Sequence, residues 1–166
     1  YYGDLGKDNR EASDSTLSQK PEFVTKGGRT VYGGGGITPD IYSEQNIDFN
    51  RSTNHILYHP DRLIFKFAEE LKDDIQNQYF TFDDFNKNYH LDNKTKNIFF
   101  SWLEEKEIKF DKEEIVEYWD YIQNRILSNI ASSIWGKEFF FKQLLETDNQ
   151  VQDALDHFHE ASSLIN

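Results

Sequence analysis

The sequence predicts a mainly α-helical protein, with a C-terminal bundle of five to six helices preceded by a loop and a short β-hairpin segment. Three observations support this fold class. From Leu63 onward, apolar residues recur at the spacing of helical turns. Residues that favour helix N-termini, such as Thr81 and Asp111, precede several of these runs. Residues 1–54, by contrast, combine polar stretches with most of the glycines, so we expect two parts, 1–54 and 55–166.

The first part is expected to start as a loop and to continue as a hairpin. Residues 1–20 are rich in Asp, Ser, Asn and Lys, a composition typical of loops. Two β-type runs, Glu22–Thr25 and Arg29–Tyr32, then flank Lys26–Gly28. Glycine at such a connection supplies the positive φ of a hairpin turn. An irregular linker remains the alternative interpretation, and residues 43–54 are expected to be a polar connector.

The first three helices of the second part are located by apolar spacing and by capping residues. Pro60 suits the first turn of the first helix, and Thr81 suits the N-cap of a short second helix that ends near Tyr89. The third helix is expected to begin at Asp92 or Asn93. The apolar positions of the first and third helices are Leu63, Ile64, Phe67, Ala68, Leu71, Ile98, Phe99, Trp102 and Leu103.

The longest periodic run is expected to form one helix from Asp111 to about Ile134. Asp111 with Glu114 three residues later has the pattern of a capping box, in which each side chain accepts a hydrogen bond from the other residue's backbone N–H. Gly136 then ends this helix. A short helix and a last one capped within residues 147–148 complete the bundle. The apolar positions of these helices are Ile115, Tyr118, Trp119, Ile122, Ile126, Ile130, Ile134, Phe139, Phe140, Leu144, Leu145, Val151, Ala154, Leu155 and Phe158.

Composition and charge exclude several kinds of partner and site. The 166 residues are within the size range of one domain, and aromatic residues make up 16%, so we expect a folded core rich in aromatic side chains. A net charge of −12 repels nucleic-acid phosphates and anionic lipid headgroups. The chain has no cysteine for a disulfide, a thiolate nucleophile or a zinc site. No apolar run reaches the roughly 20 residues that span a bilayer.

Most side chains that could carry chemistry are better interpreted as structural. Ser132 and Ser133 lie within the longest expected helix, where a hydroxyl commonly bonds a local backbone carbonyl. His55 and His59 are four residues apart, but Pro60 argues against one continuous helix there. We therefore expect surface histidines, no metal site and no catalytic serine in these positions.

A second histidine pair and the paired acidic residues are likewise expected to be surface features. His157 and His159 are two residues apart and so point in different directions on a helix. Asp83 and Asp84 suit the first turn of a helix, whose dipole favours negative charge. Glu113 and Glu114 likewise suit the first turn of a helix, and the other acidic pairs are Glu69 and Glu70, Asp73 and Asp74, and Glu104 and Glu105. No cofactor is predicted.

The most distinctive stretch of the chain contains four consecutive glycines, Gly33–Gly36. Val31 and Tyr32 before it favour an extended backbone, and the glycines lack Cβ atoms, so another backbone can approach closely. A phosphate-binding loop is not expected, because Pro39 stands where a helix should begin and the Lys-Ser/Thr ending is missing. A strand followed by an exit at Pro39 fits the residues better.

This stretch resembles a hallmark of the carboxyl-terminal processing serine peptidases, also called tail-specific proteases, which reads Gly-Arg-x-Val-Tyr-Gly-Gly-Gly-Gly-Ile-x-Pro-Asp-Ile. The matching positions are Gly28, Arg29, Val31, Tyr32, Gly33, Gly34, Gly35, Gly36, Ile37, Pro39, Asp40 and Ile41. In that family the motif lies downstream of a peptide-binding PDZ module and of the catalytic serine and lysine. A chain that begins shortly before the motif and contains no methionine is therefore expected to be a C-terminal fragment without those parts.

The resemblance implies that residues 1–54 are the tail end of a peptidase core and that residues 55–166 form a helical C-terminal domain. It implies that the parent protein cleaves proteins near their C-termini, whereas this fragment alone is inactive and has a structural or regulatory role. The expected partners are the remainder of the peptidase core and its protein or peptide substrates, and self-association into a homo-oligomer is left open. The implied location is the periplasm, the cell envelope or the extracellular space. The alternative is a free-standing helical module for protein interaction.

Overall fold

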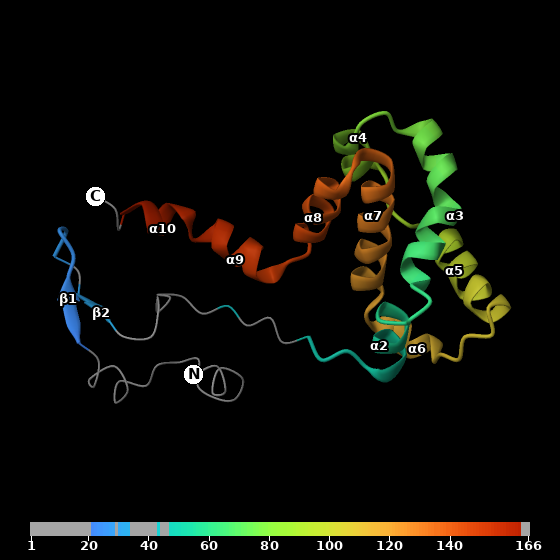
Figure 1. The fold of residues 1–166 in the computed structure, drawn as a ribbon, viewed down its shortest axis with the longest axis horizontal. Helices are drawn as coiled ribbons and strands as arrows, with labels where there is room; N and C mark the ends of the chain where they lie inside the picture. The colour runs from blue at the N-terminus through green and yellow to red at the C-terminus, as the bar shows by residue number, and fades with distance from the viewer. Residues whose placement is uncertain (1–20, 29, 34–42, 44–46, 164–166) are drawn as a thin grey trace. The chain divides into compact units, whose positions relative to one another are not determined.

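The computed structural model describes residues 21–28, 30–33, 43 and 47–163 (Figure 1). Helices account for 68% of these residues, in nine segments, and the only sheet within them is a two-stranded antiparallel one. The mainly α-helical fold class is therefore confirmed. Contacts divide the chain into two compact units: Asn46–Asp148, called the helical unit below, and a second unit of Tyr1–Gln45 with Asn149–Asn166.

The second unit contains the expected hairpin. Strand β1 (Glu22–Val24) pairs with β2 (Thr30–Tyr32), with Phe23 opposite Val31. In the turn, Gly28 has a φ of 82°, and its N–H donates to the carbonyl of Thr25 at 3.0 Å. A left-handed φ strains most side chains but not glycine, so the sequence places a suitable residue at this turn.

The helical unit contains seven of the nine helices, and α7 lies at its centre. These are α2 (Arg51–Leu57), α3 (Leu63–Gln78), α4 (Phe82–Asn88), α5 (Asn93–Glu105), α6 (Lys112–Glu117), α7 (Trp119–Trp135) and α8 (Lys137–Leu145). Helix α7 packs against α3 and α8 (Figure 1). The other two helices, α9 (Asn149–Asp156) and α10 (Phe158–Ser163), belong to the second unit.

Three helices begin at the capping residues that the sequence indicates. The side chain of Thr81 accepts from the N–H of Asp84 at 3.2 Å, and that of Asp92 accepts from Thr95 at 2.7 Å. Asp111 accepts from the N–H of Glu114 at 3.1 Å. Each bond satisfies a donor that the first helical turn leaves free, which fixes where α4, α5 and α6 start.

The single helix expected from Asp111 to about Ile134 is wrong, because Tyr118 separates α6 from α7. Tyr118 has φ −111° and ψ 26°, outside the helical region, and its hydroxyl donates to the carbonyl of Asp48 at 3.1 Å. Its ring meets Phe49 edge-on at a centroid distance of 5.2 Å. Residues on both sides of the break face the core, so the apolar periodicity runs through it unchanged and conceals it.

Three other boundaries differ from those expected. Pro60, expected in the first turn of the first helix, lies in a turn before α3, which begins at Leu63. Helix α2 begins at Arg51, within the stretch predicted to be a polar connector, because Asn50 caps it by accepting from the N–H of Thr53 at 2.9 Å. The last expected helix is divided by a turn at His157 into two helices, α9 and α10. The unexpected helix α2 and the breaks at Tyr118 and His157 explain why the described residues form nine helices and not the expected five to six.

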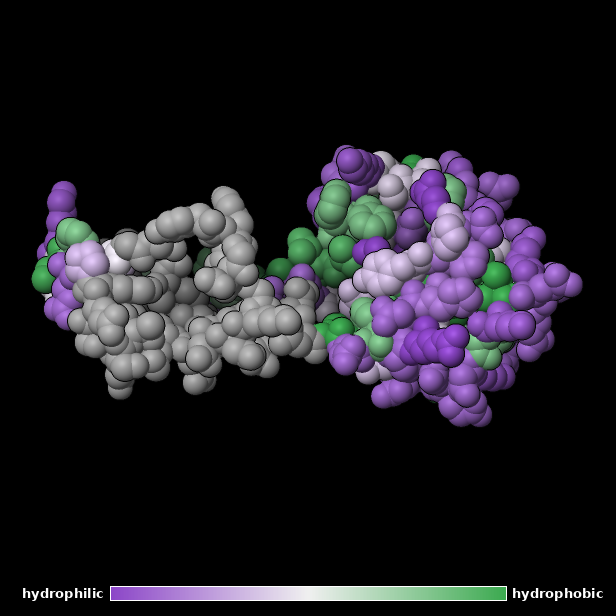
Figure 2. Space-filling view, turned by 60° about the horizontal axis from the view of Figure 1, so that its bottom comes forward, coloured by the Kyte–Doolittle hydropathy of each residue, from purple (hydrophilic) through white to green (hydrophobic). Residues whose placement is uncertain are grey.

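The core of the helical unit is rich in aromatic side chains, as expected from the composition. Phe67 of α3 meets Phe99 of α5 at a centroid distance of 4.8 Å and Trp102 at 5.5 Å. The largest fully buried apolar side chains are Phe67, Phe85, Phe99, Ile56, Leu103, Ile115, Ile122, Ile126 and Ile130. Polar side chains dominate the visible outer face of the unit (Figure 2).

Candidate functional site

The structure describes only the beginning of the glycine-rich motif. Gly28 lies in the hairpin turn, and Val31 and Tyr32 lie in β2. The N–H of Gly33 donates to the carbonyl of Pro21 at 2.8 Å, and an added Cβ would lie 2.5 Å from Cε2 of Phe23. The remaining motif positions, which lie outside the described residues, are Arg29, Gly34, Gly35, Gly36, Ile37, Pro39, Asp40 and Ile41.

Ser133 does not bond a local carbonyl as expected. Its hydroxyl donates to the carboxylate of Glu69 on α3 at 2.6 Å, and Lys72 pairs with the same carboxylate at 3.7 Å. The expected bond is instead found at Ser128, whose hydroxyl donates to the carbonyl of Asn124 at 2.7 Å. The bond runs between two helices, from Ser133 on α7 to Glu69 on α3. Ser133 therefore joins α7 to α3.

The two histidine pairs form no metal site among the residues that the structure covers. The rings of His55 and His59 lie 4.9 Å apart although His59 follows the end of α2. His59 is half-buried, with a side chain only 13% exposed, so the expectation of a surface residue is wrong there. In the second unit, Nδ1 of His157 lies 3.3 Å from the carboxylate of Glu160.

The acidic pairs Asp83–Asp84 and Glu113–Glu114 lie in the first turns of α4 and α6, as expected. Glu114 has a further role, because its carboxylate accepts from the backbone N–H of Ser52 in α2 at 2.9 Å. The N–H of Asp111 donates to the Ser52 hydroxyl at 2.9 Å. The second hydrogen bond of the expected capping box would run from the Asp111 N–H to the Glu114 carboxylate. Instead, both groups bond Ser52 of α2.

Helices α7 and α8 share a buried pair of amide side chains. Nε2 of Gln143 donates to Oδ1 of Asn124 at 3.0 Å, and Nδ2 of Asn124 donates to Oγ1 of Thr147 at 2.6 Å. Oε1 of Gln143 is buried without a hydrogen-bond partner in the part of the chain that the structure describes. Because a misaligned amide would leave further polar atoms unpaired, this pair fixes how α8 lies on α7.

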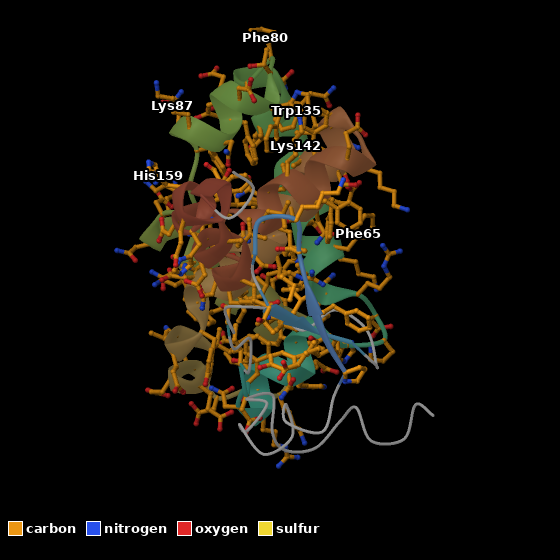
Figure 3. The ribbon with its side chains drawn as sticks, turned by 90° about the vertical axis from the view of Figure 1, so that its left-hand side faces the viewer. Phe65, Phe80, Lys87, Trp135, Lys142 and His159 are labelled. Atoms are coloured by element: carbon orange, nitrogen blue, oxygen red, sulfur yellow. The ribbon has the colours of Figure 1, made fainter. Side chains whose placement is uncertain are left out.

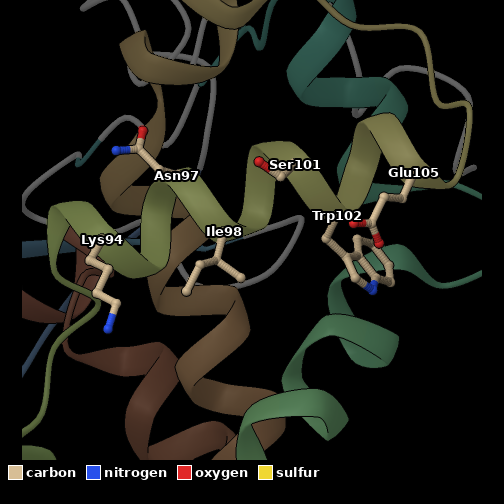
Figure 4. A pocket seen from close by; sticks show the side chains of 6 residues that line it. All are labelled: Lys94, Asn97, Ile98, Ser101, Trp102 and Glu105. Atoms are coloured by element: carbon tan, nitrogen blue, oxygen red, sulfur yellow. The ribbon is translucent and has the colours of Figure 1, made fainter.

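An open groove runs along α5 (Figure 4). It has a volume of about 490 Å³, and its lining comprises Lys94, Asn97, Ile98, Ser101, Trp102 and Glu105. Ile98, expected to be buried, is 47% exposed here. The buried Nε1–H of Trp102 has no acceptor among the described residues. One cation and one carboxylate line the groove, so its charge favours neither anions nor cations.

A second cavity, called the arginine cavity below, has a clear charge preference. It measures about 240 Å³ and is lined from the end of α2, the start of α3, and α7 and α8. Its basic lining residues are His59, Arg62 and Arg125, and none of the residues that line it is acidic. The aromatic ones are Tyr58, Phe65 and Phe140. The chain as a whole has a net charge of −12, whereas the lining of this cavity is positively charged.

Arg62 occupies an unusual position at the N-cap of α3. Its backbone is left-handed, with φ 55° and ψ 52°, and no side chain caps the helix. No acidic residue lies in the first turn, where the helix dipole would favour one. The guanidinium carbon lies 4.2 Å from the centroid of Phe65. A strained backbone and a cation at the positive end of a helix both cost stability, a combination found at functional sites.

Arg125 enters the same cavity from α7. It is half-buried, and its guanidinium carbon lies 5.4 Å from the ring centroid of Phe140 on α8. Within the described residues, neither Arg62 nor Arg125 has a carboxylate at ion-pair distance. Both guanidinium groups thus lie over aromatic rings and have N–H donors available for an anion.

Sequence reasoning missed the arginine cavity because no local pattern connects its residues. Arg62 and Arg125 are 63 positions apart in the sequence, and arginine is ordinary on a helix surface. The absence of a good N-cap residue before Leu63 was a detectable signal, because Arg62 stands where Ser, Thr, Asp or Asn is favoured.

No helix of the described residues is both long and apolar enough to cross a membrane.

Comparisons with known proteins give one match, to a family of unknown function. No curated protein and no solved structure matches the chain. Residues 61–136 match the model of DUF8443, a family of unknown function; this stretch is less than half of the chain, and it includes both arginines of the arginine cavity.

Proposed function

We propose that this chain is the C-terminal portion of a serine endopeptidase that processes protein C-termini, and that the portion itself is not catalytic. The observation that carries the proposal is the glycine-rich motif from Gly28 to Ile41, whose defined residues all match the carboxyl-terminal processing pattern. Proteolysis then takes place in the periplasm, cell envelope or extracellular space. The partners of this portion are the remainder of the peptidase core and the substrates of the parent protein.

The described residues are compatible with a non-catalytic role. The hydroxyl of Ser133 donates to the carboxylate of Glu69 at 2.6 Å, and this bond serves as a contact between helices. The helical unit has its own core of buried aromatic and aliphatic side chains. We infer a structural or regulatory role for it. The hairpin and the glycines after it supply strands to the peptidase core.

Substitution within the glycine run of the intact parent protein tests this role. Gly35→Val adds a branched side chain where we propose that another backbone approaches closely, so cleavage of an unfolded protein substrate should fall at least about tenfold. Gly27→Ala is the matched control, because an added Cβ there meets only Oγ1 of Thr25, at 4.0 Å. The control should cleave at the unaltered rate.

The readout is the rate at which intact substrate disappears, followed by mass spectrometry. Full activity of the Gly35→Val protein would show that the run has no role in a catalytic core. Absence of any cleavage by the unaltered parent protein would contradict the proposed peptidase function itself.

A further inference from the structure

We propose that the arginine cavity binds a carboxylate carried on an apolar or aromatic group. The inference rests on the geometry of the helical unit and does not depend on the proposed peptidase role. The cavity lies wholly within Asn46–Asp148, and its basic lining residues have no ion-pair partner among the described residues except the contact of His59 with Asp61 at 3.7 Å.

The charge of the lining selects an anion. Arg62 and Arg125 each present a planar fork of N–H donors, the geometry that matches a carboxylate in a bidentate contact. Each guanidinium lies over a phenylalanine ring, at 4.2 and 5.4 Å from the centroid. These rings limit the freedom of the two arginines, so less conformational entropy is lost when an anion binds.

A third lining residue, with a ring N–H, is His59. The backbone N–H of Asp61 donates to its Nδ1 at 3.1 Å, which assigns the hydrogen of the neutral ring to Nε2. The start of α3 adds a positive partial charge, because no side chain caps it and no acidic residue lies in its first turn. His59, Arg62 and the start of α3 are close in the sequence, and both side chains line the cavity, whereas Asp61, whose carboxylate lies 3.7 Å from Nδ1 of His59, does not.

The apolar lining selects what carries the anion. Leu57, Ile64, Phe65 and Phe140 contribute hydrocarbon surface to the same cavity. Its volume of about 240 Å³ is below the roughly 300 Å³ at which pockets for drug-sized ligands begin. A ligand of the size of 3-phenylpropionate, with one carboxylate and one ring, fits these features better than a bare inorganic anion or a large cofactor.

Titration of the full chain with 3-phenylpropionate, monitored by amide NMR shifts, tests the proposal. We expect saturable binding with a Kd of about 1 mM or below, a reasonable affinity for so few ligand atoms. The uncharged analogue 3-phenylpropionamide should bind at least about tenfold more weakly, because it cannot form a charged bidentate contact. Inorganic phosphate at the same ionic strength should not displace the acid.

Arginine variants show whether the cavity is the site. Arg125→Gln and Arg62→Gln should each weaken binding of 3-phenylpropionate about tenfold or more. Lys142→Gln is the matched control: Lys142 also lies over a ring, 4.7 Å from the centroid of Phe139 on α8, but it does not line the cavity. Figure 3 shows Phe65 and Lys142 projecting at separate places on the helical unit. The control should bind like the unaltered chain.

Four outcomes would overturn the proposal: no saturable binding of the acid, equal binding of acid and amide, equal weakening by Lys142→Gln, or displacement by phosphate. Circular dichroism checks that each variant is folded. Because Arg62 is exposed, the Arg62→Gln variant still tests the site if Arg125→Gln unfolds.

A parallel titration with N-acetyl-Gly-Gly-Phe identifies the source of the carboxylate. Tighter binding than 3-phenylpropionate indicates the end of a polypeptide, and weaker binding indicates a free small acid.

Discussion

The carboxylate of Glu114 accepts a hydrogen bond from the backbone N–H of Ser52 at 2.9 Å, across 62 positions of the sequence. The Ser52 hydroxyl accepts from the N–H of Asp111 at 2.9 Å, so each helix satisfies a donor at the start of the other. This exchange joins α2 to α6 and fixes the chain segment that leads into the arginine cavity.

Removal of the Glu114 carboxylate should destabilise the helical unit. Glu114→Ala leaves the N–H of the buried Ser52 without its acceptor, and we expect a loss of about 1–3 kcal/mol in the free energy of unfolding. Glu113→Ala is the control, because Glu113 lies in the same first turn but is exposed. Urea denaturation of the full chain measures both, and equal losses for the two variants would refute the contact's role.

The amide pair of α7 and α8 should behave as one interaction. Gln143→Ala and Asn124→Ala each remove a hydrogen bond and leave its buried partner unpaired, at a cost of about 1–3 kcal/mol each. The double variant should cost less than the sum by about 1 kcal/mol, because neither partner of the bond between Gln143 and Asn124 is then left unpaired. Thermal and urea unfolding of the four proteins gives the coupling free energy. Strict additivity would show that the two amides act independently.

Glu107 occupies a position that favours glycine. Its φ is 57°, and it follows the C-cap of α5 in a motif where the N–H of Ile108 donates to the carbonyl of Leu103 at 3.0 Å. Glu107→Gly should raise the free energy of unfolding by about 0.5–1 kcal/mol, since glycine adopts this backbone without strain. Glu107→Ala keeps the strain and should bring no gain. A stabilisation of the same size by alanine would exclude backbone strain as the cause.

Tyr89 should make the protein less stable at alkaline pH. Burial raises the pKa of Tyr89 from 10.0 to about 12, and the carboxylates of Asp92 and Asp74 add to this shift together with Tyr79. Because the folded-state pKa lies above the unfolded value, this stabilisation is complete below pH 10.0 and is lost as the pH rises toward about 12.

Tyr89→Phe should therefore lose less stability than the unaltered chain over this pH range. The measurement is urea denaturation at several pH values across it. Tyr58→Phe serves as the control, because that side chain is 69% exposed, and its stability should follow the unaltered chain. Identical alkaline profiles for the Tyr89 variant and the unaltered chain would contradict the assignment.

Local signals allowed much of this fold to be predicted from the sequence. Thr81, Asp92 and Asp111 cap their helices through contacts only three residues along the chain. Gly28 likewise marks its own turn. Such contacts are encoded by adjacent residues, so sequence spacing alone is enough to find them.

Contacts between distant residues account for what the sequence could not predict. Tyr118 interrupts the longest apolar period because its hydroxyl and ring contact residues 48 and 49. The positive φ of Glu107 has no sequence signal, because glycine is absent there. Arg62 and Arg125 line the same cavity only after α3 and α7 have packed together.

Cleavage of an unfolded protein substrate by residues 1–166 alone tests most directly whether this chain is the non-catalytic portion of a peptidase. The predicted result is no hydrolysis by the chain alone, alongside hydrolysis by the intact parent protein that is lost when a serine upstream of Tyr1 is replaced. Hydrolysis by residues 1–166 that disappears in a Ser133→Ala variant would contradict the proposal, because Ser133 would then be a nucleophile and not a contact to Glu69.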